Sequence, residues 1–137
     1  MKTETIILSI HPRHIEKILS GEKLYEFRKR IPLEIRYIVI YATAPIKKIV
    51  AFIEIDKIIK DTPEIVWKKT KKHAGISEDY FLRYFKDKQV AYAVKVKRVT
   101  KLKDPVLLIR LNYNCAPQSY MYVNKHIDEL KKLLCIS

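Results

Sequence analysis

Short runs of β-branched and other apolar residues dominate this chain, and few helical segments separate them. The ranges that read as strands are Thr5–Ile10, 23–28, Tyr37–Ala42, 49–60 and 90–99, with 106–111 as a sixth extended candidate. A parallel sheet needs a long crossover connection between paired strands, and the strands between residues 23 and 60 follow one another without a helix. We therefore expect an α+β domain in which a small, mixed or antiparallel β-barrel is flanked by helices.

Four helical segments are expected from their start signals and from the spacing of apolar residues. The first, Pro12–Ser20, carries an apolar stripe and ends at Gly21, which can adopt the left-handed conformation. Thr62 and Ser77 each precede a further helix, because a hydroxyl caps the helix and the acidic residues that follow complement its dipole. The last helix, 124–134, is amphipathic and is expected to pack against the sheet.

The charge balance is strongly basic. Lys and Arg number 28 against 15 Asp and Glu, a formal net charge of +13. The excess is largest over residues 91–137, where nine basic residues face three acidic ones. Such an imbalance favours a polyanionic partner such as nucleic acid, with solubility alone as the alternative. With 48% hydrophobic residues, the chain has enough apolar material for one packed domain, 1–137.

Several classes of site are disfavoured. Gly21 and Gly75 are the only glycines, so neither a P-loop nor a G-x-G-x-x-G turn can be built. His11 and His14 form an H-x-x-H pair without an evident third ligand, and we expect no metal and no cofactor. The sequence also offers no helix-turn-helix to read duplex DNA, which leaves a transcription-coregulator role without a motif.

The cysteines and the N-terminus bear on the compartment. Cys115 and Cys135 form no C-x-x-C pair, so we expect two small buried or half-buried side chains rather than a disulfide or zinc site. The first apolar run is too short for a signal peptide or a membrane span, which favours a cytoplasmic protein that does not bind membranes. The bias to 21 Lys and 20 Ile, with only 5 Asn plus Gln, favours a thermophilic source.

The most informative segment is SGEKLYEFRKR, residues 20–30, directly after the first expected helix. It places five charged residues in eight positions beside two aromatic ones. In a strand, alternation puts Lys23 and Phe27 on one face and Glu26 and Arg28 on the other. Such charges belong either to a ligand site or to an exposed strand patterned for solubility, and composition alone leaves both interpretations open.

This segment and its surroundings resemble a known family. Leu8-Ser9-Ile10-His11-Pro12, followed by Gly21-x-Lys23-x-x-Glu26-x-Arg28, resembles the signature of ASCH domains, which are G-x-K-x-x-E-x-R members of the PUA-like superfamily. The later strands and the stretch Pro117-Gln118-Ser119-Tyr120 are similar to small archaeal and viral ASCH proteins, so the likeness covers nearly the whole chain. It implies a β-barrel with helices over one side, and a cleft that binds RNA or a modified nucleoside.

The resemblance also implies roles for individual residues. Arg28 would fork onto a phosphate or a base edge, and Lys23 would meet phosphate as a point charge. Glu26 would orient these cations or accept a hydrogen bond from an exocyclic amine. An RNA-binding function of this kind points to translation or RNA metabolism. The further residues expected to contact RNA are Ser9, His11, Lys29, Tyr41 and Gln118.

Aromatic residues fall into two expected groups. Tyr41 lies near a strand end, where an unpaired base can stack on its ring. Four aromatic residues at helical spacing within 80–85, among them Tyr80 and Tyr84, are expected to pack in the core.

An enzymatic alternative uses the same residues. Some ASCH relatives are ribonucleases, and others are amidohydrolases that remove acyl groups from N4-acylated cytidine. In the latter the signature Lys is the nucleophile or base, partnered by a Thr three residues later and a Glu from the helical region. Lys23 matches the first position, but Glu26 replaces the Thr and is expected to hold Lys23 protonated; Glu78 is a loose candidate for the third. The alternative is thus a metal-independent hydrolase that uses Lys23 and Glu26.

Overall fold

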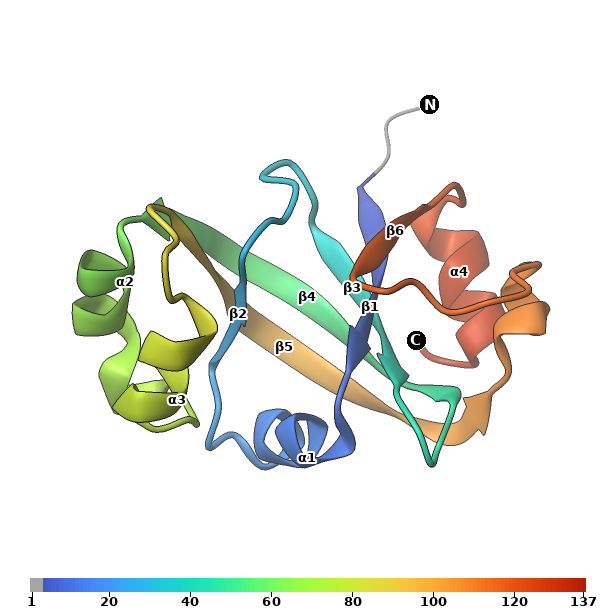
Figure 1. Cartoon of the computed structure of the whole chain (residues 1–137). Coiled ribbons are helices and arrows are strands. Elements are labelled where there is room, and N and C mark those ends of the chain that lie inside the picture. Colours follow the sequence, from blue (N-terminus) through green and yellow to red (C-terminus); the bar gives the residue numbers. More distant parts are fainter. Residues whose placement is uncertain (1–3) are drawn as a thin grey trace.

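Six strands form one mixed sheet in the computed structural model, which describes residues 4–137. The strands are β1 (Thr5–Ile10), β2 (Tyr25–Arg28), β3 (Tyr37–Ala42), β4 (Lys48–Asp61), β5 (Ala91–Val106) and β6 (Tyr120–Val123). Their order across the sheet is β2-β5-β4-β3-β1-β6. β1 and β3 pair in parallel, and the other neighbours are antiparallel. The sheet curls into a half-barrel (Figure 1), which confirms the expected α+β architecture.

Helices lie at both ends of this sheet. They are α1 (Pro12–Ser20), α2 (Pro63–Thr70), α3 (Glu78–Tyr84) and α4 (Ile127–Leu134), with short 3-10 turns at Lys71–His73 and Leu108–Leu111. The hydroxyls of Thr62 and Ser77 accept the hydrogen bonds that cap α2 and α3, as expected from the sequence. In Figure 1, α2 and α3 lie together beside the β2 end, and α4 covers the opposite end. In the described chain, no helix is long and apolar enough to span a membrane.

The curl follows from the long β4 and β5 strands. Their pairing shifts register at three places, including between Ile49 and Ala51 and between Ile55 and Lys57. Each shift bends the ribbon and increases its twist. As a result both faces of the sheet are buried along β1: Leu8 packs inside the half-barrel with α1, whereas Ile7 packs on the outer face with α4. A third apolar cluster joins β2 and β5 to α2 and α3.

Two local expectations were wrong. Residues 106–111 are not a strand, because β5 ends at Val106 and Leu108–Leu111 forms a 3-10 turn. Leu108 and Leu111 are both buried, and residues three apart share one side of a 3-10 turn. Conversely, Tyr120–Val123 was not expected as a strand. It becomes β6 by pairing with β1, a contact that four residues of local pattern do not reveal.

The expectation for the cysteines was also wrong, since both side chains are exposed. Cys135 takes the left-handed position that ends α4, with φ of 58°, and its side chain therefore lies outside the packed stripe of that helix. Cys115 lies in the connection that leads to β6.

The curl has a direct consequence for the site. β2 and β1 are separated by three strands in the sheet order. Even so, Nη2 of Arg28 on β2 donates a 2.9 Å hydrogen bond to the carbonyl oxygen of Ser9 on β1. The two strands therefore face each other across the open side of the half-barrel, and the space between them is where the signature residues meet.

Candidate functional site

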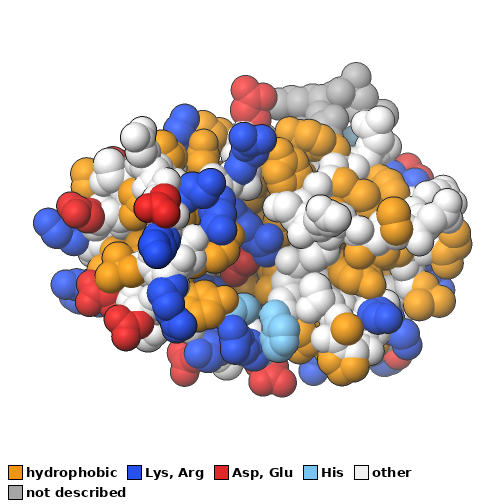
Figure 2. Space-filling view, in the orientation of Figure 1, with side chains coloured by type: hydrophobic (Ala, Val, Ile, Leu, Met, Phe, Trp, Pro, Cys, Tyr) orange, Lys and Arg blue, Asp and Glu red, His pale blue; other side chains and the backbone are white. Residues whose placement is uncertain are grey.

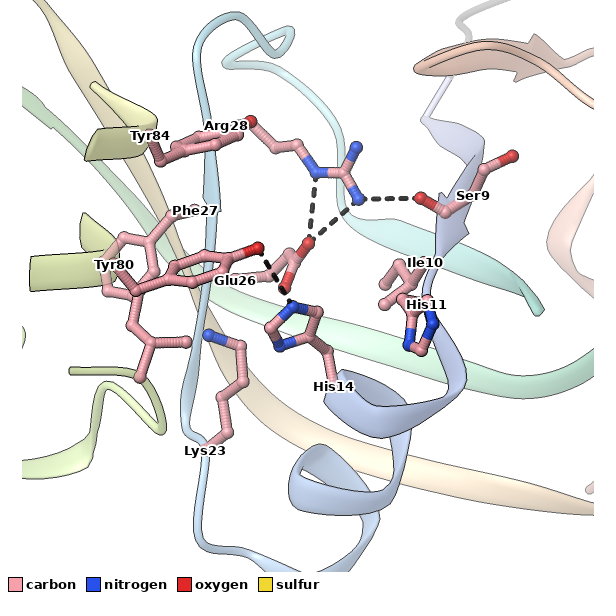
Figure 3. A pocket seen from close by; sticks show the side chains of 11 residues that line it. Ser9, Ile10, His11, His14, Lys23, Glu26, Phe27, Arg28, Tyr80 and Tyr84 are labelled. Atoms are coloured by element: carbon pink, nitrogen blue, oxygen red, sulfur yellow. Dashed lines mark hydrogen bonds and ion pairs between the residues drawn. The ribbon is translucent and has the colours of Figure 1, made fainter. Parts of the chain in front are cut away.

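A cavity of about 150 Å³ lies between β1, β2, α1 and α3. Figure 2 shows the hollow near the middle of this face, with an acidic side chain set back behind Lys, Arg and His side chains. Its lining consists of Ser9, Ile10, His11, His14, Lys23, Glu26, Phe27, Arg28, Ile76, Tyr80 and Tyr84. Five residues expected from the sequence, Ser9, His11, Lys23, Glu26 and Arg28, are thus brought together here (Figure 3).

Glu26 and Arg28 form a buried ion pair in the pocket. Nε and Nη2 of Arg28 donate to Oε2 of Glu26 at 3.1 and 2.9 Å. Both side chains are largely buried, with 8% of Glu26 and 13% of Arg28 exposed. Together with the bond to Ser9, three of the five guanidinium N–H donors are used within the protein. Arg28 therefore forks onto Glu26, and its first role is to fix that carboxylate.

Ser9 contributes to the pocket through its backbone. Its carbonyl oxygen accepts from Arg28, but its hydroxyl donates to the carbonyl oxygen of Pro117 at 2.7 Å. In Figure 3 the Ser9 side chain points away from the other labelled residues. The hydroxyl thus ties β1 to the connection before β6.

Lys23 is 2% exposed, and its Nζ donates to the carbonyl oxygen of Ala74 at 2.8 Å. The same Nζ lies 4.7 Å from the centre of the Phe27 ring. Burial lowers the pKa of Lys23 to about 8; Glu26 opposes this shift, and Lys17 and Arg28 add to it. Loss of solvent therefore outweighs the attraction of Glu26, but with a pKa of about 8 the Lys23 side chain stays mostly protonated at pH 7, as expected.

β2 begins only at Tyr25, so Lys23 lies in the segment before the strand rather than in a strand over 23–28. Lys23 and Phe27, which were expected on one face, do lie against each other, and both line the same pocket as Glu26 and Arg28.

The segment between α2 and α3 holds Lys23 in place. The backbone N–H of Leu24 donates to the carbonyl oxygen of His73 at 2.9 Å, and Nζ of Lys17 donates to that of Gly75, also at 2.9 Å. Gly75 has φ of +69°, and a Cβ atom there would lie 2.5 Å from Cβ of Lys23. Only glycine satisfies both the backbone conformation and this close approach. The sequence did not identify this role of Gly75.

His14 is a pocket residue that sequence reasoning missed. Its Nε2 lies 3.4 Å from the Tyr80 hydroxyl, and its Nδ1 is buried without a hydrogen-bond partner in the described chain. Burial is the largest cause that lowers the pKa of His14; Lys23 adds to the shift and Glu26 opposes it. The imidazole is therefore neutral at pH 7. The sequence signal for this residue was the H-x-x-H spacing to His11, which we interpreted only as a possible pair of metal ligands.

Two tyrosines of α3 that were expected in the core line the pocket, although Tyr84 also packs against the apolar cluster of α2 and α3. Tyr80 and Tyr84 are half-buried and line the cavity, whereas Phe81 and Phe85 are buried as expected. Burial is the largest cause that raises the pKa of Tyr84. The residue type could have distinguished the two groups. The two positions that face the cavity are four residues apart, and both hold tyrosine rather than phenylalanine.

Three expected RNA contacts lie outside the pocket lining. Lys29 is at its rim, with Nζ 4.7 Å from the centre of the Tyr84 ring. Tyr41 lines a separate shallow cavity with Lys47, and Gln118 is exposed in the connection before β6. Glu78, the candidate third catalytic residue, is exposed in the first turn of α3 and is not part of the lining.

The histidines do not form a metal site with their neighbours. Nδ1 of His11 accepts from the backbone N–H of Arg13 and caps α1, and the His11 ring meets that of His14 edge to face at 6.4 Å. Within residues 4–137, no three His, Cys, Asp or Glu side chains are grouped closely enough to hold a metal ion.

Comparison with known proteins places this fold and site in context. No family model matches the chain. The N-terminal domain of McrB from Staphylothermus marinus covers all of this chain and 96% of that one, with a TM-score of 0.61 at 12% identity, a likeness of fold alone. The crystal structure of ASCH from Zymomonas mobilis has a TM-score of 0.83 at 28% identity and covers 96% of this chain and 94% of that one.

Sequence comparison agrees. The ASCH domain-containing ribonuclease of Zymomonas mobilis is 30% identical over 137 residues, which span 96% of this chain and 90% of that protein. The narrower likeness to archaeal and viral members, and the thermophilic source, stay predictions. The identity, extending over nearly the full length of both proteins, together with the shared half-barrel, shows that this chain belongs to the ASCH domain family.

Proposed function

We propose that this domain binds RNA, or a modified nucleoside within RNA, by taking one unpaired nucleotide into the pocket. The observation that carries the proposal is the group formed by Lys23, Glu26 and Arg28, in which charged side chains are buried beside an open cavity. Burying charge is costly unless its partners are fixed, and the partners here leave polar atoms free for a ligand.

The size of the cavity limits what can enter. At about 150 Å³ it is smaller than most small-molecule sites, which are roughly 300–1,000 Å³. A base or a phosphate is therefore the largest part of RNA that it can enclose. Base edges become accessible in unpaired nucleotides, which favours single-stranded segments over duplex.

The free polar groups match such a ligand. The Lys23 ammonium donates one hydrogen bond to Ala74, and its other N–H donors can bind a phosphate or carbonyl oxygen. Oε1 of Glu26 has no hydrogen-bond partner within residues 4–137 and can accept from an exocyclic amine, while Arg28 holds the carboxylate by its other oxygen. His11 and Lys29 supply polar and positive groups at the rim.

The wider properties of the chain support the same proposal. A net charge of +13 attracts a polyanion from a distance, and the relative from Zymomonas mobilis is described as a ribonuclease, a protein that acts on RNA. We assign the activity to RNA metabolism or translation in the cytoplasm, without a cofactor or a metal.

Fluorescence anisotropy with a labelled single-stranded RNA tests this function. We expect saturable binding that weakens as salt rises, because bound phosphates release counterions. Arg28→Lys should lower affinity by about tenfold, since a lysine cannot hold Glu26 by a planar fork. Arg110→Lys, an exposed change of the same kind, is the control. Equal affinity of both variants, with circular dichroism unchanged, would contradict the proposal.

Cleavage of the bound RNA is the second candidate, and the unpartnered Nδ1 of His14 is the observation that favours it. In the tautomer whose Nε2–H donates to Tyr80, Nδ1 carries a free lone pair. It can take the proton of a ribose 2′-hydroxyl as the 2′-oxygen attacks the adjacent phosphorus. The bond from phosphorus to the 5′-oxygen then breaks, and the Lys23 ammonium donates a proton to that oxygen. Proton exchange with solvent afterwards restores neutral His14 and charged Lys23. Glu26 orients Lys23, and the products carry a 2′,3′-cyclic phosphate and a 5′-hydroxyl.

The amidohydrolase form of this alternative has less support, because Glu78 lies outside the pocket lining. RNA cleavage is tested by incubating RNA with the protein in a chelator and separating the products. We expect cleavage that His14→Gln reduces by about 100-fold, and no cleavage where a 2′-deoxynucleotide replaces the attacking ribose. Intact RNA with the unaltered protein would leave binding as the function.

A further inference from the structure

We propose that the RNA strand leaves the pocket across α3, over a surface formed by Tyr80, Arg83 and Tyr84 that we call the α3 ledge. The inference rests on the proposed RNA binding and extends it from one nucleotide in a pocket to a short single strand. It assigns a binding role to Arg83, which lies outside the pocket lining.

The ledge is continuous with the pocket. A second, shallow hollow of about 290 Å³ is lined by Tyr80, Arg83 and Tyr84, and the two tyrosines also line the main cavity. Tyr80 and Tyr84 are one helical turn apart on α3. A nucleotide in the pocket therefore has an open path for its neighbour along one side of this helix.

Unpaired cations border the path. The Arg13 guanidinium lies 5.6 Å from the centre of the Tyr80 ring, and Nζ of Lys29 lies 4.7 Å from the centre of the Tyr84 ring. Neither residue, nor Arg83, forms a salt bridge within the described residues. Arg83 donates only a long 3.4 Å hydrogen bond, from Nε to the carbonyl oxygen of Asp79. Their charges are thus available to phosphates.

This combination of groups fits a single strand. Aromatic rings offer surfaces on which unpaired bases stack, and adjacent cations follow the sugar–phosphate backbone. In contrast, Glu78 and Asp79 are exposed in the first turn of α3 and would repel phosphate. The path therefore runs over the C-terminal part of α3, between Arg83 and Lys29. Figure 2 shows Lys and Arg side chains around the central hollow on this face.

The test compares a mononucleotide with a longer strand. Cytidine 5′-monophosphate and a seven-nucleotide single-stranded RNA are titrated into the protein and into Arg83→Ala, with binding followed by NMR shifts and by anisotropy respectively. Arg110→Ala is the matched control, because Arg110 is also an exposed arginine in a short helix, outside both cavities. Lys29→Ala is a second exposed variant that is not expected to affect folding.

We expect Arg83→Ala and Lys29→Ala each to weaken the seven-nucleotide RNA by about 3- to 10-fold and to reduce the slope of log affinity against log salt by about 0.7. Arg83→Ala should leave the mononucleotide affinity within about twofold, and Arg110→Ala should change neither affinity. Equal losses in Arg83→Ala and Arg110→Ala would overturn the ledge while leaving pocket binding intact. If the unaltered protein bound neither the mononucleotide nor the seven-nucleotide RNA, both the proposed function and the proposed role of the α3 ledge would be overturned.

Discussion

The pocket and the C-terminal third of the chain carry positive charge in opposite ways. In the pocket, Lys23 is buried and Arg28 is fixed on Glu26 at 2.9 Å. In residues 91–137 the basic residues are more numerous, but Lys101 and Lys103, for example, are exposed. Charge counting alone would place RNA over the C-terminal third. The comparison teaches that fixed, partly desolvated groups define a site, whereas exposed charges supply attraction without position.

The largest expected effect comes from breaking the buried ion pair. Glu26→Ala leaves the Arg28 guanidinium buried without its carboxylate, so we expect the free energy of unfolding to fall by about 3–4 kcal/mol. The surface pair of Lys17 and Glu22 is the comparison: Glu22→Ala should change the free energy of unfolding by less than about 0.5 kcal/mol. Urea denaturation of both variants measures the difference. Similar losses from the two changes would show that the pocket pair is no more specialised than a surface pair.

The two glycines give the next largest contrast. Both have positive φ, but a Cβ atom at Gly75 would overlap Lys23, and one at Gly21 would meet nothing within 4 Å. We expect Gly75→Ala to lower the free energy of unfolding by about 2–3 kcal/mol and Gly21→Ala by about 1 kcal/mol. Gly75→Ala should also weaken RNA binding, because it displaces Lys23. If the two variants were equally destabilised and both kept the RNA affinity of the unaltered protein, Gly75 would have no role in positioning the site.

The features that could be predicted from the sequence are those with a local cause. The helix Pro12–Ser20, its end at Gly21 and the caps at Thr62 and Ser77 depend on residues only a few positions apart. The signature from Lys23 to Arg28 was identified for the same reason, since its members fall within six positions. Its residues do meet in one pocket, although β2 begins only at Tyr25 and Lys23 precedes it.

The features that could not be predicted depend on contacts between distant segments. The curl of β4 and β5 is what brings α3 to the pocket and places Tyr80 beside His14, 66 positions earlier in the chain. In the same way, the close approach of Gly75 to Lys23 joins the segment between α2 and α3 to the start of β2. The direction of the Ser9 hydroxyl depends on Pro117, 108 positions away. No local pattern encodes such pairings, so the sequence identified the signature residues of the pocket but missed His14 of α1 and the two tyrosines supplied by α3.

The pH dependence of RNA binding should distinguish the role of Lys23 from that of the surface lysines, with an expected change in affinity of about tenfold. The pKa of Lys23 is about 8, so its charge is present below pH 8 and is lost as the pH rises through that value. Exposed lysines such as Lys101 are the comparison, because burial does not remove solvent from their ammonium groups. We expect RNA affinity to fall by about tenfold between pH 7 and pH 9.5, and Lys23→Met to abolish this fall. If a Lys101→Met variant also lost this fall in affinity, the pH dependence could not be assigned to Lys23.

The same titration affects stability in the opposite direction. Because the folded-state pKa of Lys23 is lower than its unfolded value of 10.5, unfolding takes up a proton between about pH 8 and 10.5. The contribution of Lys23 to the free energy of unfolding therefore rises with pH in this window and is constant below it. Tyr84, whose raised pKa favours its neutral form in the folded state, opposes this rise only above about pH 10.

The smallest expected effects belong to the C-terminal lysines. Lys101→Ala and Lys103→Ala should each weaken RNA binding by less than about threefold, because exposed ammonium groups interact with RNA through a high-dielectric, salt-screened medium. Anisotropy at low and at physiological salt measures this, with Arg28→Ala as the reference for a pocket residue. If each lysine variant lost as much affinity as Arg28→Ala, attraction to RNA would be spread over the surface. A larger loss for Arg28→Ala that persists at high salt means instead that the buried groups select the ligand and the lysines only raise its local concentration.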